Sequence, residues 1–176
     1  VVLHNEGNLF ELGSSASVAF ENLAESGDNS QVLSASMVLA SASGAGVIMP
    51  GMSETIAVSV VDTQPMLLSS ATMLVNTNDA FSGVNAFSLE SMEVGESISM
   101  QTSSYDAGTE GNSELMSTIP GPAAGGEGFN AERDDVDFIS MHQGVVSQDD
   151  GLIQSVLTQA HRFDNPTLSI SITRVE

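Results

Sequence analysis

Residues 97–103 have the sequence Ser97-Ile98-Ser99-Met100-Gln101-Thr102-Ser103, in which polar and apolar side chains alternate. Strict alternation places Ile98 and Met100 on one face of the chain, as in a β-strand with one face buried. Residues 55–61 alternate in the same way, with three aliphatic residues on one face. These two stretches predict half-buried strands and therefore a sheet that covers a core on one side.

Further strands are predicted on both sides of this stretch. Residues 66–75 are rich in β-forming side chains near their end, and residues 136–141 and 168–175 form two more candidate strands. The chain opens with a short apolar strand, residues 1–3, which a turn follows at residues 5–8. We expect the strands to pair as antiparallel neighbours, because their spacing is that of hairpins.

Helical patterns are confined to the first quarter of the chain. Residues 17–25 predict a short helix, and Gly27 lies just past its end. Residues 31–40 predict a second helix, with a capping residue among positions 28–30. The two glycines at positions 44 and 46 would end it. These segments together predict a small helical insert over residues 17–40.

The order of elements predicts a mainly β fold, an antiparallel β-sandwich with a small helical insert near the N-terminus. Helical patterns come first and strands follow, without the β-α-β rhythm of a parallel sheet. A length of 176 residues predicts one domain, spanning residues 1–176. Residues 117–135, rich in glycine and proline, predict a long irregular loop that is either functional or mobile.

The negative net charge of the chain is opposite to that of typical nucleic-acid-binding proteins. Twenty-three acidic residues against three arginines give a formal net charge of −20, and lysine is absent. Such a surface repels phosphate backbones and anionic lipid headgroups, so we expect neither nucleic acid nor an anionic membrane as a partner. An acidic, lysine-free surface is typical of proteins in high-salt extracellular water, where salt screens the self-repulsion.

Several kinds of site are excluded by missing residues and motifs. The chain has no cysteine, which excludes disulfides, thiolate catalysis and cysteine-based zinc sites. The sequence contains no HExxH, GxSxG, GxGxxG or GxxxxGK[ST] pattern and no run of about 18 apolar residues for a transmembrane segment. The three histidines lie far apart, and we interpret each as a surface or structural residue. The chain starts at Val1 without a methionine, which suggests a processed or trimmed product.

The remaining chemistry lies in carboxylates that follow predicted strands. Asp79 comes after the strand at residues 66–75, and Asp106 and Glu110 come after the strand at residues 97–103. Loops of a sandwich collect at the ends of its sheets, so these two loops can meet there. Two further groups, Asp134 to Asp137 and Asp149–Asp150, are interpreted as solvated turn acids.

Calcium is the ion that such loops would bind. Calcium takes six to eight oxygen ligands, mostly carboxylates, carbonyls and water. Asp106 and Glu110 lie four residues apart around a glycine and can face one ion from a single loop, and Asp79 can approach from the other loop. From the spacing alone, two interpretations stay open: a metal site, or ordinary acids in turns.

The segments that carry these acids also resemble a known protein family. The stretch Ser70–Gly83, with its Asn-Asp-Ala-Phe loop, and the stretch Tyr105–Glu110, Tyr-Asp-Ala-Gly-Thr-Glu, followed by Ile119–Pro120, resemble the spondin domain. This module occurs in F-spondin, in mindin and in many bacterial secreted proteins. Residues 8–10, 23–28 and 163–166 resemble the bacterial branch, and the likeness extends from about His4 to Arg174.

The resemblance implies an antiparallel β-sandwich and a calcium ion held by three acids, which correspond here to Asp79, Asp106 and Glu110. It also implies a secreted, non-enzymatic module on the bacterial cell surface. Such a module serves adhesion, matrix or cell-surface assembly through an extracellular protein or glycan partner. Two departures are visible: Glu110 is longer than the aspartate of animal members, and Ala80 displaces the aromatic residue to Phe81.

Two alternatives follow from these observations. The family's opening strand would precede residues 1–3 and is not in the sequence. Either the sequence simply begins after it, or the strand comes from a removed part of this chain or from another chain, and in the last case the protein would self-associate into an oligomer or a filament. The second alternative is a hydrolase that uses Asp79, Asp106 or Glu110 as acid and base. Aromatic residues make up only 5% of the chain and tryptophan is absent, which leaves little to stack a sugar.

Overall fold

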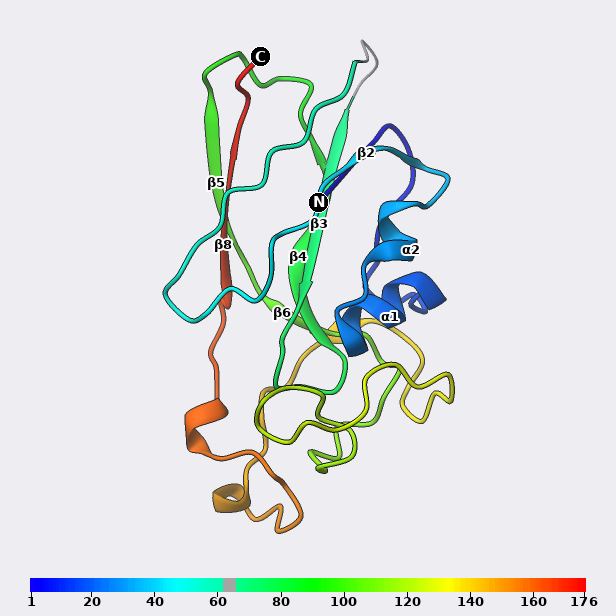
Figure 1. The fold of residues 1–176 in the computed structure, drawn as a ribbon, viewed down its shortest axis with the longest axis vertical. Coiled ribbons are helices and arrows are strands. Elements are labelled where there is room, and N and C mark those ends of the chain that lie inside the picture. The colour runs from blue at the N-terminus through cyan, green and yellow to red at the C-terminus, as the bar shows by residue number, and fades with distance from the viewer. Residues whose placement is uncertain (62–65) are drawn as a thin grey trace.

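The computed structural model describes residues 1–61 and 66–176, and eight strands and two short α-helices form within them (Figure 1). In chain order, the elements are β1 (Val2–His4), α1 (Val18–Ser26), α2 (Ser30–Leu33), β2 (Val38–Ser41), β3 (Leu67–Met73), β4 (Ala80–Ser88), β5 (Ser97–Thr102), β6 (Ser104–Asp106), β7 (Ser140–Met141) and β8 (Leu168–Thr173). Two single-turn 3-10 helices, Gln148–Asp150 and Gln159–His161, lie between β7 and β8.

The strands form two antiparallel sheets. Six strands pair in the order β2-β1-β3-β4-β6-β7, and β5 and β8 form a separate two-stranded sheet. Helices α1 and α2 lie beside the larger sheet, on the side away from the β5–β8 pair (Figure 1). The predicted mainly β, antiparallel architecture with a small helical insert is therefore confirmed.

Helix α1 has the two ends that its sequence predicts. Ser17 is the N-cap, and its hydroxyl accepts a hydrogen bond from the backbone N–H of Phe20 at 3.2 Å. Gly27 ends the helix at a φ of 76°, and its N–H donates to the carbonyl of Leu23 at 3.0 Å. A glycine adopts this left-handed conformation without steric cost, which is why the helix stops there.

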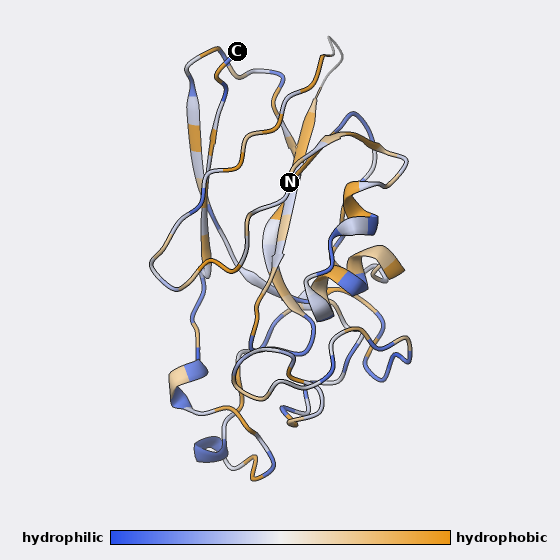
Figure 2. Cartoon of the chain, viewed as in Figure 1, coloured by the Kyte–Doolittle hydropathy of each residue, from blue (hydrophilic) through white to orange (hydrophobic). Residues whose placement is uncertain are grey.

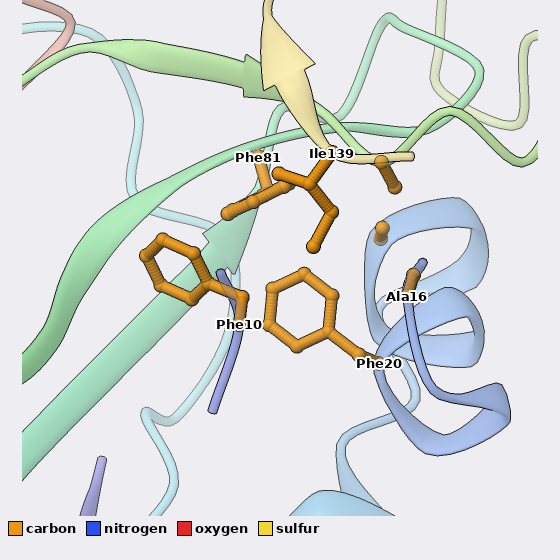
Figure 3. Close-up of a cluster of buried hydrophobic side chains, with 7 residues drawn as sticks. Phe10, Ala16, Phe20, Phe81 and Ile139 are labelled. Atoms are coloured by element: carbon orange, nitrogen blue, oxygen red, sulfur yellow. The ribbon is translucent and has the colours of Figure 1, made fainter. Parts of the chain in front are cut away.

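An aromatic cluster joins α1 to the larger sheet (Figure 3). The rings of Phe20 and Phe81 meet edge to face with centroids 4.7 Å apart, and Phe10 contacts Phe81 at 5.0 Å. Ile139 packs into the same cluster from the segment before β7. Because Phe81 is the second residue of β4, this cluster fixes the start of that strand and the loop before it.

The predicted second helix is wrong over most of its length. Helix α2 covers only Ser30–Leu33, and residues 38–41 form β2 instead. β2 pairs antiparallel with β1, with Leu3 opposite Ala40. Backbone pairing with a neighbouring strand outweighs the weak helical preference of these residues, because tertiary context routinely overrides local propensity.

Two predicted strands are also wrong. Residues 55–61 form no strand, although their side chains alternate between half-buried and exposed. Of residues 136–141, only Ser140–Met141 pair, as β7. The segment before β7 is bent, and Asp137 adopts a φ of 57°, which is incompatible with a strand. The strands at residues 66–75, 97–103 and 168–175 are confirmed as β3, β5 and β8.

The N-terminal strand does not lie at an edge. β1 pairs with β3 on one side and with β2 on the other, so the expected gap beside it is filled. The ends of the larger sheet are β2 and β7. Residues 117–135 form turns without a helix or strand, as predicted, and Ile119 from this loop packs in a separate small cluster with Val145 and Leu157.

Candidate functional site

The two acidic loops meet at one end of the larger sheet. Asp79 directly precedes β4 and Asp106 ends β6, and these strands pair so that Ala80 lies opposite Asp106. The loop that follows β6 carries Glu110. The exposed fractions of Asp79, Asp106 and Glu110 are 0%, 5% and 4%, so all three predicted site acids are buried rather than solvated.

Hydrogen bonds tie the two loops together. One carboxylate oxygen of Asp79, Oδ2, accepts from the backbone N–H groups of Thr109 at 2.8 Å and of Glu110 at 3.1 Å. The Thr109 hydroxyl donates to the same oxygen at 3.2 Å. The side-chain amide of Asn78 donates to the carbonyl of Glu110. Asp79 thereby holds the second loop through its backbone and keeps its other oxygen free of these bonds.

Asp106 shapes its own loop. Its Oδ1 accepts from the N–H of Gly108 at 2.8 Å, and its Oδ2 accepts from the side-chain amide of Asn112 at 2.7 Å. Gly108 has a φ of 71°, and a Cβ there would lie 2.3 Å from the carbonyl oxygen of Phe138. Only glycine fits both the backbone angle and this approach. Both oxygens of Asp106 are therefore engaged by the protein.

Four buried oxygens at the loops have no hydrogen-bond partner among the described residues. They belong to two carboxylates and two amides: Asp79 Oδ1, Glu110 Oε2, Asn78 Oδ1 and Asn112 Oδ1. An unpaired buried acceptor costs about 1–3 kcal/mol, and more if it is charged. Carboxylate and amide oxygens are the ligands that calcium prefers, so the chemistry of this donor set fits the ion.

Burial, together with nearby negative charge, raises the pKa of two of these acids. Burial, followed by the charge of Asp106, raises the pKa of Asp79 to about 7. Burial, followed by the charge of Glu25, raises the pKa of Glu110 to about 8. Near neutral pH, these carboxyls therefore carry a proton unless a cation compensates their charge.

Helix α1 supplies a further acid to the loops. Glu25 accepts from the Thr109 hydroxyl at 2.7 Å with one oxygen and from the backbone N–H of Asn130 at 2.8 Å with the other. Its side chain is buried, and burial raises its pKa. Glu25 thereby connects α1, the loop after β6 and the long irregular loop.

Arg133 anchors the long loop to the same helix. Its guanidinium donates to both carboxylate oxygens of Glu21, at 3.0 and 2.7 Å, and to the carbonyl of Ala16 at 2.8 Å. It also contacts Asp137. This two-pronged pairing satisfies a glutamate whose side chain is only 3% exposed, and it raises the pKa of the guanidinium above its ordinary value.

The acids do not form a ready-made cation cage. Within residues 1–61 and 66–176, no group of three or more His, Asp or Glu side chains is arranged to hold a metal ion as it stands. At Asp106, both carboxylate oxygens already accept hydrogen bonds from the protein. Asn78 and Asn112, which were not predicted as site residues, lie within or beside the two loops and carry unpaired amide oxygens.

Two of the histidines are buried, and Nε2 of His142 has no hydrogen-bond partner among the described residues. His4 is buried and contacts the Glu6 carbonyl and the Ser69 hydroxyl, and His142 accepts from the N–H of Gly144 at 2.9 Å. Two surface hollows are lined by residues 143–145, 159 and 162–164, and by residues 45–49 and 52–54. Neither hollow borders the acidic loops.

The fold defines the chain as a mainly β, antiparallel module. The family model described as Spondin_N matches residues 2–121, and the chain belongs to this family. The family consists of modules of the extracellular type. No curated protein matches the chain. Among the described residues, no helix has the length and apolar character that crossing a bilayer requires.

Proposed function

We propose that the protein is a secreted, non-enzymatic, calcium-binding module for extracellular adhesion, matrix or cell-surface assembly. The observation that carries this proposal is the set of buried, unpaired oxygens at the two loops, two of which belong to carboxylates. Burying such oxygens without a partner is costly, and a divalent cation bound between the loops would offset this cost for the oxygens that face it. Asp79 and Glu110 would supply the charged ligands.

The remaining residues have supporting roles in this proposal. Asn78 and Asn112 would supply neutral amide oxygens. Asp106 was expected as a direct ligand, and its hydrogen bonds favour a role in positioning Asn112 and in adding negative charge beside the ion. Because Asp79 also holds the backbone of Thr109 and Glu110, an ion bound there would fix both loops relative to β4 and β6.

Fixed loops suit a module that recognises partners. Loops at the end of a sheet carry binding surfaces when a rigid scaffold holds them. Ordering the loops before a partner arrives reduces the entropy lost on binding. We propose an extracellular protein or glycan as this partner and the bacterial cell surface as the site of action.

Calorimetric titration with calcium tests the proposal. We expect one binding event in wild-type protein and loss of it in Asp79→Asn. Asp149→Asn makes the same change of charge at an exposed acid and should bind as wild type does. Absence of binding in the wild-type protein at millimolar calcium would refute the proposed function.

The raised pKa values of Asp79 and Glu110 also suit a hydrolase, because a catalytic acid must hold its proton near neutral pH. Both side chains are buried, however, and neither described hollow reaches them. Neither of these hollows gives a substrate a route to the two carboxyls, and we favour calcium binding. Hydrolysis of an oligosaccharide panel that Asp79→Asn abolishes would reverse this preference.

A further inference from the structure

The two-stranded sheet has two unprotected edges. Among the described residues, β5 and β8 pair only with each other, so each strand has one side without a sheet neighbour. Edge strands of natural proteins usually carry charges, prolines or bulges that prevent pairing with another chain. β5 and β8 contain none of the charged residues or prolines, and their register is regular from Ser97–Thr173 to Thr102–Leu168.

The apolar face of this sheet is incompletely covered. Its five aliphatic side chains remain half-buried and belong to none of the three hydrophobic clusters of the described residues. They are Ile98, Met100, Leu168, Ile170 and Ile172. Figure 2 shows hydrophobic and hydrophilic residues alternating along β5. A sheet with a half-exposed apolar face and free edges can accept a further strand.

Residues 55–61 have the properties of that strand. Their sequence is Thr-Ile-Ala-Val-Ser-Val-Val, uncharged and rich in β-branched residues, with Ile56, Val58 and Val60 half-buried on one side. Their backbone groups make no hydrogen bond to another described backbone group. In Figure 1 the segment is drawn as a thin tube that passes across the β5–β8 pair in this view and forms no strand with it. Pairing with a sheet edge would satisfy the backbone N–H and C=O groups of an extended segment with this composition.

We propose that residues 55–61 of one copy of this chain add as a third strand to a free edge of the β5–β8 sheet in a second copy. Main-chain hydrogen bonds would hold the strand, and its three aliphatic side chains would extend the apolar face. This contact requires no calcium and does not involve the acidic loops.

The absence of charge at the contact makes a second copy admissible as the occupant, although the rest of the surface is acidic. Two copies with a formal net charge of −20 repel each other over most of their surfaces. Residues 55–61, β5 and β8 are free of charge, so copies can approach there with the least repulsion. Each copy offers one strand and two free sheet edges, either of which could accept a strand, and this permits a closed dimer or an open chain of copies.

Sedimentation velocity over a range of concentrations tests the self-association. We expect association that strengthens from low salt to 1 M NaCl, where the Debye length falls to about 3 Å. Val58→Pro and Ser59→Pro form a pair, because successive N–H groups point to opposite sides of a strand and one of the two must face the acceptor edge. At least one variant should stay monomeric. Val47→Pro, in another unpaired stretch, should associate as wild type does.

Cysteine pairs identify the contact directly, because the chain has no cysteine of its own. Ser59→Cys is mixed with Ser171→Cys or Ser169→Cys on β8, and with Ser99→Cys or Ser97→Cys on β5, all at exposed positions. We expect a disulfide-linked dimer from at least one mixture under mild oxidation, at a yield well above that of Ser59→Cys mixed with Ser14→Cys.

Two results would overturn the proposal. One is a monomer at all concentrations in 1 M NaCl with no cross-link above the control. The other is a double variant, such as Ser59→Cys with Ser171→Cys in one chain, that cross-links only within that chain and runs as a monomer. Calcium and chelator should give the same association and the same cross-links, because the contact does not involve the acidic loops. The calcium proposal is tested separately by the calorimetric titration.

Discussion

Replacing Asp79 by asparagine is expected to stabilise the calcium-free protein and to abolish its response to calcium. Above pH 8 the folded protein must ionise a carboxyl whose pKa is about 7, against an ordinary value of 3.8. At about 1.4 kcal/mol per pKa unit, this ionisation costs about 4 kcal/mol of folding stability. Asparagine avoids this cost because it carries no charge.

Part of this gain is lost again in the variant. The backbone N–H groups of Thr109 and Glu110 now donate to a neutral amide oxygen instead of a carboxylate. Each exchange weakens a charge-assisted bond by about 1 kcal/mol. The net gain is therefore about 2 kcal/mol, which corresponds to a rise in Tm of about 4–8 °C for a chain of this size.

Calcium should reverse the order of stability of the wild type and Asp79→Asn. At a hundredfold excess over Kd, mass action stabilises the wild type by about 2.7 kcal/mol, and at a thousandfold excess by about 4.1 kcal/mol. Asp79→Asn gains nothing, so it becomes the less stable protein by about 1–2 kcal/mol. Thermal unfolding by circular dichroism at pH 8, in chelator and in calcium, measures both differences.

The exposed Asp149→Asn variant serves as the control, with a change below about 0.5 kcal/mol and a full calcium response. A Tm of Asp79→Asn below that of the wild type in chelator, or a calcium-induced rise in Tm that survives in this variant, would refute the role assigned to Asp79.

Gly108→Ala should lower the stability by more than about 2 kcal/mol in urea unfolding, because the added Cβ meets a backbone oxygen at a positive φ; an unchanged midpoint would contradict this. Arg133→Met leaves the buried Glu21 carboxylate unpaired and should cost about 3–5 kcal/mol, whereas Arg162→Met removes an exposed pair worth less than about 1 kcal/mol. Equal losses in the two variants would refute the assigned role of Arg133. Without calcium, stability should fall as pH rises from about 4 to 8, because the two buried loop carboxyls keep their protons in the folded chain to about pH 7 and about 8 and lose them near pH 4 when unfolded. Calcium should remove most of this fall, and a flat profile in chelator would contradict the raised pKa values.

Local sequence patterns predicted correctly those elements whose ends or faces depend on residues nearby in the sequence. Ser17 and Gly27 mark the ends of α1, and the alternation in residues 97–103 marks β5. The same local rules were wrong for residues 38–41, because the partner that makes them a strand lies at the N-terminus. Residues 55–61 show the opposite case. Their sequence has the pattern of a strand, but they pair with no strand among the described residues.

The meeting of the two acidic loops was predictable because strand ends collect at the edge of a sheet. The detailed roles within the loops were not. Nothing in the spacing of Asp106 reveals that Gly108 and Asn112 occupy both of its oxygens. The pairing of Arg133 with Glu21 joins residues 112 positions apart, and no local pattern carries such information.

The two anchors of the long loop have a practical consequence for anyone who trims this chain. The family match stops at residue 121, yet Asn130 and Arg133 lie beyond that point and satisfy two buried glutamates of α1. A truncation at the end of the matched region would leave both glutamates without these donors. Expression designs should therefore retain the chain at least through Asp137.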